Sequence, residues 1–111
     1  MEEKLLEIAQ KLYKRTKEGS ISWSLTDNDN IYQVDVSEYI IKISKEQLSV
    51  EPIFNLNIFN LSGVFLLSIN SKEIETISEI PAATAMNEIY QIARRQALGV
   101  DKAIDDILKS L

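Results

Sequence analysis

The chain has 111 residues, of which 45% are apolar and 26% are charged, and its formal net charge is −5. This length and composition predict a single globular domain over residues 1–111, because a disordered chain carries fewer apolar residues. The sequence contains no cysteine and no histidine. Disulfides, thiol nucleophiles, zinc sites built on Cys or His, and Ser–His–Asp triads are therefore excluded. The acidic balance argues against nucleic acid or an anionic membrane as the main partner.

The first predicted element is a helix over residues 2–18. Leu5, Ile8 and Leu12 recur at helical spacing, and Gly19 supplies the left-handed residue that commonly ends a helix. No basic, apolar leader precedes this helix, and no apolar run in the chain reaches the length of a membrane span. We therefore expect a cytoplasmic location.

After residue 20 the apolar period changes from helical spacing to alternation, which predicts strands. Five strands are expected, over residues 21–25, 32–36, 39–44, 54–58 and 64–69, with a loop over residues 45–52. Short connections between consecutive strands favour an antiparallel meander. The last predicted strand is apolar on both faces, which predicts that it is central in the sheet or covered on both sides.

Two helices are predicted after a charged connector over residues 70–80. The first begins with Pro81 just ahead of it or in its first turn, runs to Leu98 and is stopped by Gly99. Asp101 is expected to cap a short third helix. The buried side of that helix is predicted to carry Ala103, Ile104, Ile107, Leu108 and Leu111. The predicted fold class is α+β, an antiparallel five-stranded meander sheet with one N-terminal and two C-terminal helices packed on one face.

The two faces of the predicted sheet differ in composition. The face that carries Trp23 is expected to form the core and to receive the helices. The outer face mixes apolar residues with uncharged amides, a composition typical of an interface core. With an arginine pair on the second helix, these residues form the candidate interaction surface, namely Ile31, Ile40, Ile53, Phe59, Asn55, Asn57, Arg94 and Arg95.

Both parts of this surface also have a purely structural interpretation. The sheet could curl toward a barrel, or a helix could cover part of the outer face. Arg94 and Arg95 could be an ordinary surface pair with Glu88 or Gln91 within reach on the same helix.

No catalytic, cofactor-binding or metal-binding residue is predicted. The three glycines are isolated, so the chain has no Gly-rich loop that could hold a phosphate. Four acids between Asp27 and Glu38 fall at the spacing of a calcium loop, but Tyr32 stands where the sharp turn of such a loop needs glycine. We therefore expect neither an enzyme nor a cofactor.

Two stretches of the chain resemble a family of small bacterial proteins. The first is Thr16–Trp23, TKEGSISW, where a helix ends and a strand begins. The second is Ala93–Leu108, ARRQALGVDKAIDDIL, which spans the predicted helical pair around Gly99. The resemblance covers nearly the whole chain and implies the same order of helix, strands and helical pair. It implies no activity and no active-site residue.

Three functions are compatible with these patterns. The preferred one is a non-enzymatic, cytoplasmic protein-interaction module of a bacterial or mobile-element accessory system, which acts through the outer sheet face and could form a homodimer. The second is a small-molecule-binding domain with a pocket between sheet and helices, where polar contacts would come from Tyr13, Tyr32, Tyr39 or Tyr90. The third is a nucleic-acid accessory protein that uses Lys11, Lys14, Arg15, Lys17 and Arg94.

Overall fold

The computed structural model describes residues 2–47 and 50–111. The order of elements is α1 (Glu2–Glu18), β1 (Ser24–Leu25), β2 (Ile31–Val36), β3 (Tyr39–Glu46), β4 (Ile53–Asn60), β5 (Phe65–Asn70), β6 (Thr76–Ile77), β7 (Ile80–Pro81), α2 (Ala82–Leu98) and α3 (Val100–Ser110). The first five strands form one antiparallel sheet in the order β1-β2-β3-β4-β5, and β6 pairs with β7 in a separate hairpin. The predicted α+β class, the five-stranded meander and the order of helices are confirmed.

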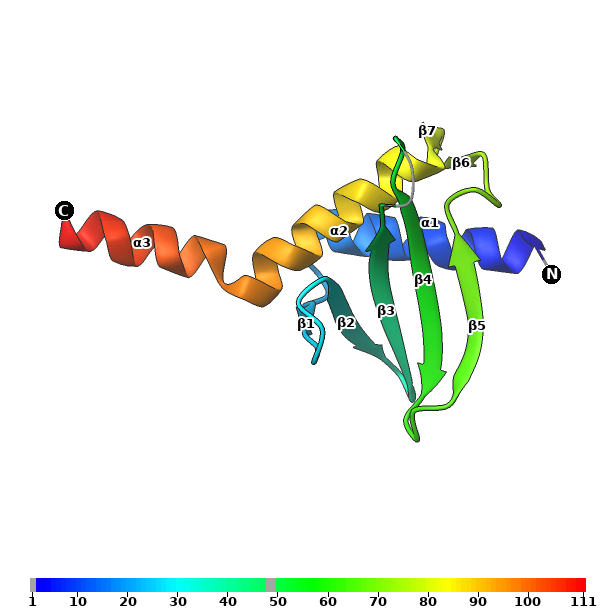
Figure 1. Ribbon diagram of the computed structural model, residues 1–111, viewed down its shortest axis with the longest axis horizontal. Helices are drawn as coiled ribbons and strands as arrows, with labels where there is room; N and C mark the ends of the chain where they lie inside the picture. Colours follow the sequence, from blue (N-terminus) through cyan, green and yellow to red (C-terminus); the bar gives the residue numbers. More distant parts are fainter. Residues whose placement is uncertain (1, 48–49) are drawn as a thin grey trace.

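Helices α1 and α2 lie on one face of the sheet, as Figure 1 shows. The alternating apolar residues of the strands point toward these helices and are buried there, which explains why the alternation predicted the core face. The largest buried apolar side chains from the sheet side and its flanks are Trp23, Tyr32, Val34, Ile41, Ile43, Phe54, Leu56, Ile58 and Ile69.

Trp23 joins three parts of the core. Its side chain is 3% exposed, and its indole Nε1–H donates to the Thr16 hydroxyl of α1 at 3.2 Å. Its backbone N–H donates to the side-chain oxygen of Gln96 on α2 at 3.0 Å. The residue therefore ties both helices to the beginning of the sheet.

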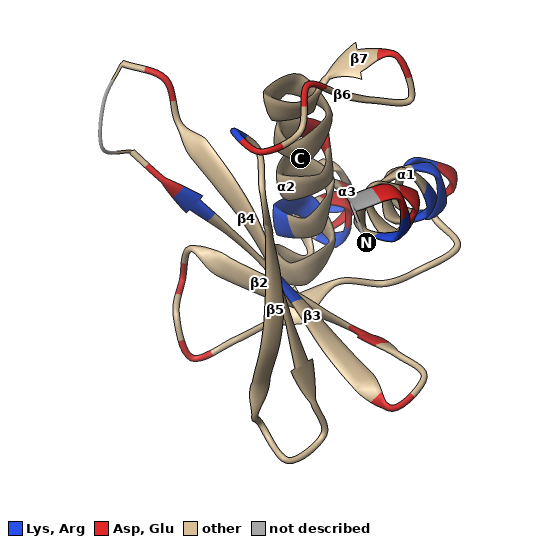
Figure 2. Ribbon diagram, turned by 90° about the vertical axis from the view of Figure 1, so that its right-hand side faces the viewer, with Lys and Arg blue, Asp and Glu red and all other residues tan. Residues whose placement is uncertain are grey.

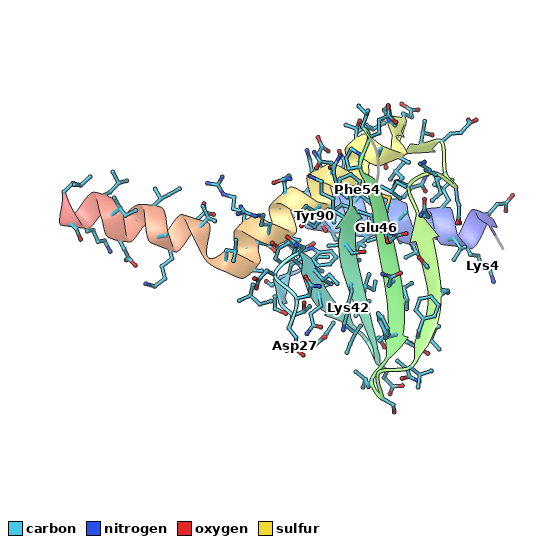
Figure 3. The ribbon with its side chains drawn as sticks, in the orientation of Figure 1. Lys4, Asp27, Lys42, Glu46, Phe54 and Tyr90 are labelled. Carbon is cyan, nitrogen blue, oxygen red and sulfur yellow. The ribbon has the colours of Figure 1, made fainter. Side chains whose placement is uncertain are left out.

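An aromatic cluster fills the centre of the interface between sheet and helix α2. The Tyr90 ring lies 5.4 Å from the Tyr32 ring and 5.9 Å from the Phe54 ring, measured between centroids. Figure 3 labels Tyr90 on α2 and Phe54 on β4 on either side of this interface. Tilted ring pairs at this spacing stabilise a core beyond the area they bury.

The position predicted for the fifth strand is wrong. Strand β5 is an edge strand with β4 as its one neighbour in the sheet, and Phe65 and Leu66 are 54% and 47% exposed. In a meander the last strand must lie at an edge, and that topology outweighs the apolar composition from which a central position was predicted. A β-bulge between Ile58 and Phe59 shifts the pairing at the same place.

Two smaller differences concern strand length. Strand β1 has only two residues, and Leu25, which alternation places on the same predicted core face as Trp23, is 52% exposed. Strand β3 continues to Glu46, into the predicted loop, because residues up to Glu46 pair with β4 as far as Ile53.

The third helix does not pack on the sheet. Figure 1 shows α3 projecting from the rest of the molecule, and none of its residues is buried. Its cap is Gly99, in the left-handed conformation at φ 67°, and not Asp101. Two antiparallel helices usually need a loop of about two to five residues, so the single residue Gly99 leaves α3 no length in which to turn back.

Candidate interaction surfaces

The strand pairing arranges the outer sheet face in rows that cross the sheet. One row holds Ile40 on β3, its partner Phe59 on β4 and then Phe65 on β5. The Phe59 and Phe65 rings lie 5.7 Å apart in an edge-to-face arrangement. The row lies at the beginning of β3, the end of β4 and the beginning of β5, and this end of the strands extends beyond the helices in Figure 1.

The next rows are polar but almost uncharged. Asn57 stands between Lys42 and Ser68, and Asn55 stands between Ser44 and Asn70. The Asn70 amide Nδ2–H donates to the Asn55 side-chain oxygen at 2.9 Å. The Lys42 ammonium lies 4.9 Å from the centroid of the Phe59 ring, which places the one cation of these rows over an aromatic face.

The six sheet residues of the candidate surface therefore share one face. Ile31, Ile40, Ile53, Asn55, Asn57 and Phe59 all lie on it, and each is partly exposed. Helices α1 and α2 lie against the opposite face. The structure does not bring the two arginines to this face.

Arg94 and Arg95 lie on α2, and both are exposed. The Arg95 guanidinium donates to a single carboxylate oxygen of Asp101 through Nε at 2.9 Å and Nη2 at 2.8 Å. This ion pair connects α2 to α3 across Gly99. The sequence interpretation that paired the arginines with Glu88 or Gln91 missed it, because Asp101 lies beyond the predicted helix end.

The edge of β5 is the feature of this face that the sequence interpretation missed. Strands β4 and β5 contain no Lys, Arg, Asp or Glu, and Figure 2 shows β5 free of charge along its length. Natural edge strands usually carry a charge, a proline or a bulge that prevents pairing with another chain. In β5 only the bulge opposite Phe59 is present. The signal that could have revealed the edge is the meander order itself.

A groove lies on the helix side of the sheet, between α1 and the hairpin of β2 and β3. It has a volume of about 360 Å³ and is lined by Ile8, Lys11, Leu12, Arg15, Ile21, Val36 and Ile41. Figure 2 shows α1 nearly end-on, with the strands extending past it without a helix over them. The lining is apolar, and two basic side chains stand at its rim.

Three of the four tyrosines proposed for a small-molecule pocket donate hydrogen bonds within the domain, and Tyr39 is 45% exposed. The Tyr32 and Tyr90 hydroxyls donate to the backbone oxygens of Asp29 and Asn30, at 3.0 and 3.2 Å. The Tyr13 hydroxyl donates to the Glu88 carboxylate. None of these side chains lines the groove between α1 and β2.

Two tyrosines have a raised pKa. The hydrogen bond to Glu88 is the main cause of the raised pKa of Tyr13, with burial and the charge of Glu88 adding to it. Burial is the main cause of the raised pKa of Tyr90. Both phenols therefore stay protonated at neutral pH and hold structure rather than accept protons.

The basic residues of α1 are largely paired with acids. Lys11 lies 3.1 Å from Glu7, and Lys17 lies 3.6 Å from Glu88, which joins α1 to α2. A cation that neutralises a phosphate must first leave its acidic partner. This arrangement gives no support to the nucleic-acid alternative.

Comparison with known proteins gives no relative. No family model, curated protein or solved structure matches the chain. Within residues 2–47 and 50–111, no helix has the length and apolar content needed to cross a bilayer. In the same residues, no three acidic side chains gather in a group that could hold a metal ion.

Proposed function

We propose that the protein is a non-enzymatic interaction module that binds an extended, apolar segment of a partner protein. The partner strand pairs with the free edge of β5, and its side chains contact the apolar row of Ile40, Phe59 and Phe65. The bacterial origin, the cytoplasmic location and the role in an accessory system stay predictions.

The observation that carries this proposal is the edge of β5, which is uncharged and which no other strand in the described part of the chain pairs with. A strand that presents free backbone N–H and C=O groups can accept another strand, and peptide-binding domains use this mode of recognition. The neighbouring outer face offers the apolar contacts that give such binding its selectivity. Its amide rows add hydrogen-bond donors and acceptors without the desolvation penalty of charges.

The partner segment should have an apolar residue at every second position and few acidic residues. Side chains alternate in direction along a strand, so every second residue of the bound segment would face the same side as Phe65. Lys42 lies over the Phe59 ring and is the only cation in these rows, so the face offers little to a strongly acidic segment.

A selection from a random peptide library displayed on phage tests this proposal. The selected peptides are expected to carry alternating apolar residues, and their affinity is measured by fluorescence anisotropy. Phe59→Glu and Leu66→Lys should each weaken binding by about tenfold or more, because a charge then enters an apolar contact. Leu25→Lys is the matched control, since Leu25 is similarly exposed on β1 at the opposite edge.

Two results would contradict the proposal. One is a selection that yields no peptides with alternating apolar residues. The other is a selected peptide that binds the Phe59→Glu and Leu66→Lys variants as tightly as the unmodified protein, with circular dichroism spectra showing that all variants are folded.

A further inference from the structure

Helix α3 is an amphipathic helix, and no part of residues 2–47 and 50–98 covers its apolar side. At 100° per residue, Val100, Ile104, Ile107, Leu108 and Leu111 fall on one side, Asp101 and Asp105 follow Leu108 at its border, and Lys102, Asp106 and Lys109 lie opposite. Ile107 is 58% exposed, and no residue of α3 is buried. A helix this short is marginal alone in water, so its stability must come from packing against another surface.

The joint between α2 and α3 holds this helix away from its own domain. The Gly99 N–H donates to the carbonyls of Arg95 and Gln96, and the Ala103 N–H donates to the Gly99 carbonyl. The ion pair of Arg95 with Asp101 spans the same joint. These contacts fix the direction in which α3 leaves the domain, and a one-residue connection is too short for an antiparallel return.

The groove between α1 and β2 matches the size of the uncovered side of α3. The α1 wall of the groove runs from Ile8 to Arg15, which spans about 10 Å along a helix axis. The apolar side of α3 runs from Val100 to the C-cap Leu111, about 16 Å, and its part beyond the joint, from Ile104 to Leu111, has the same seven-residue rise of about 10 Å as the groove wall. The groove lies on the core face of the sheet, where the sequence pattern placed a third helix.

The charges of the two surfaces are also complementary. The rim of the groove carries Lys11, which is paired with Glu7, and Arg15, whose guanidinium has no ion-pair partner within residues 2–47 and 50–111. On α3, Asp105 lies beside Leu108 at the border of the apolar side and likewise has no ion-pair partner in the described chain. A bound α3 can therefore place an acid against a base at the rim.

We propose that α3 of one copy docks in the groove between α1 and β2 of a second copy, so that two chains exchange their C-terminal helices. Reciprocal exchange forms two identical contacts around a two-fold axis and closes the assembly. This inference goes beyond the proposed peptide binding and uses a different surface, because the outer sheet face and the β5 edge stay free in the dimer.

Reversal of the charges of Asp105 and Arg15, one at a time and then together, tests the contact between α3 and the groove. Asp105→Arg and Arg15→Glu should each weaken dimerisation by about fivefold, and the double variant should regain most of the loss, as measured by sedimentation equilibrium. Lys14→Glu is the matched control, because Lys14 is on α1 but does not line the groove. Ile107→Glu should abolish the dimer while the circular dichroism spectrum shows an intact fold.

Introduced thiols identify the occupant of the groove, because the chain has no cysteine of its own. Leu108→Cys in one chain and Val36→Cys in a second, mass-tagged chain should form a mixed disulfide faster than Leu108→Cys does with Leu25→Cys. A mixed product is expected only when α3 of one chain reaches the groove of the other.

Several outcomes would overturn the inference. These are a protein that stays monomeric at millimolar concentration, dimerisation unaffected by Ile107→Glu, and preferential linkage of Leu108→Cys chains to each other, which indicates paired α3 helices. A chain carrying both Leu108→Cys and Val36→Cys that closes its disulfide within a monomer would also overturn it. None of these outcomes depends on whether β5 binds a peptide.

Discussion

Replacement of Trp23 tests the arrangement of the core. The indole is 3% exposed and lies where α1, α2 and the first strand meet. Trp23→Ala removes the ring and leaves the Thr16 hydroxyl without its donor. We expect this variant to be among the least stable single substitutions in the chain.

The size of the effect follows from two contributions. Truncation of an enclosed aromatic ring costs about 3–5 kcal/mol, and a buried hydroxyl that loses its partner costs about 1–3 kcal/mol more. A domain of this size is stable by about 5–15 kcal/mol, so Trp23→Ala removes much of the free energy of unfolding. Trp23→Phe keeps most of the ring contacts and should cost about 1–2 kcal/mol.

Urea unfolding followed by circular dichroism measures both variants, because the signal does not depend on the indole. Trp23→Phe should lower the urea midpoint by about 1 M. In a double-mutant cycle with Thr16→Val, the two losses should be less than additive by about 1 kcal/mol, since both remove the same hydrogen bond. A Trp23→Ala midpoint near that of the unmodified protein would refute the placement of the indole.

Three further predictions follow from backbone geometry and from titration. Glu79 has φ 67° in the turn between β6 and β7, so Glu79→Gly should raise the free energy of unfolding by about 1 kcal/mol in urea titrations; a lower value contradicts this. Gly19→Ala should destabilise the domain by about 1–2 kcal/mol, whereas Gly99→Ala should leave the urea midpoint of the diluted monomer nearly unchanged, because no residue of α3 is buried and a changed joint removes no packing from the core; equal losses for both would contradict this. The raised pKa of Tyr13 means that the folded chain keeps its proton more tightly than the unfolded chain, so stability should fall as pH rises above about 10. Tyr13→Phe should reduce this fall in urea midpoints measured on both sides of that pH; a fall of unchanged size would contradict the role given to the Tyr13 hydroxyl.

Much of the fold could be predicted because local signals agreed with the tertiary structure. The alternation of Phe54, Leu56 and Ile58 marks the core face of β4, and all three are buried. Gly99 ends α2 in the left-handed conformation, as its position in the sequence indicated. These features depend on residues close together in the chain, which a sequence pattern records.

The errors concern contacts that sequence patterns cannot specify. The apolar residues of α3 were assigned to the core of their own chain, because a pattern shows that a helix needs a covering surface but not which surface provides it. The apolar composition of residues 64–69 predicts burial, although strand β5 lies at the edge. In both places apolar residues lie on the surface of the domain. These residues belong to the two proposed docking surfaces, the edge of β5 and the apolar side of α3.

The outer-face residues Ile40, Phe59 and Asn57 could be grouped from the sequence because strand alternation gives the face of each residue directly. Their arrangement in rows could not, since the pairing of β3 with β4 depends on register. The rows place Ile40 and Phe59 beside Phe65, at the beginning of β5. We therefore expect the apolar contacts with a partner at the Phe65 end of β5.

Hydrogen–deuterium exchange of the protein with a selected peptide tests the claim that it works through the edge of its sheet. The account predicts slower exchange of backbone amides in Phe65–Asn70 when the peptide is bound, with no change in Ser24–Leu25 at the other edge. Protection confined to the groove between α1 and β2, or absent from β5, would contradict it.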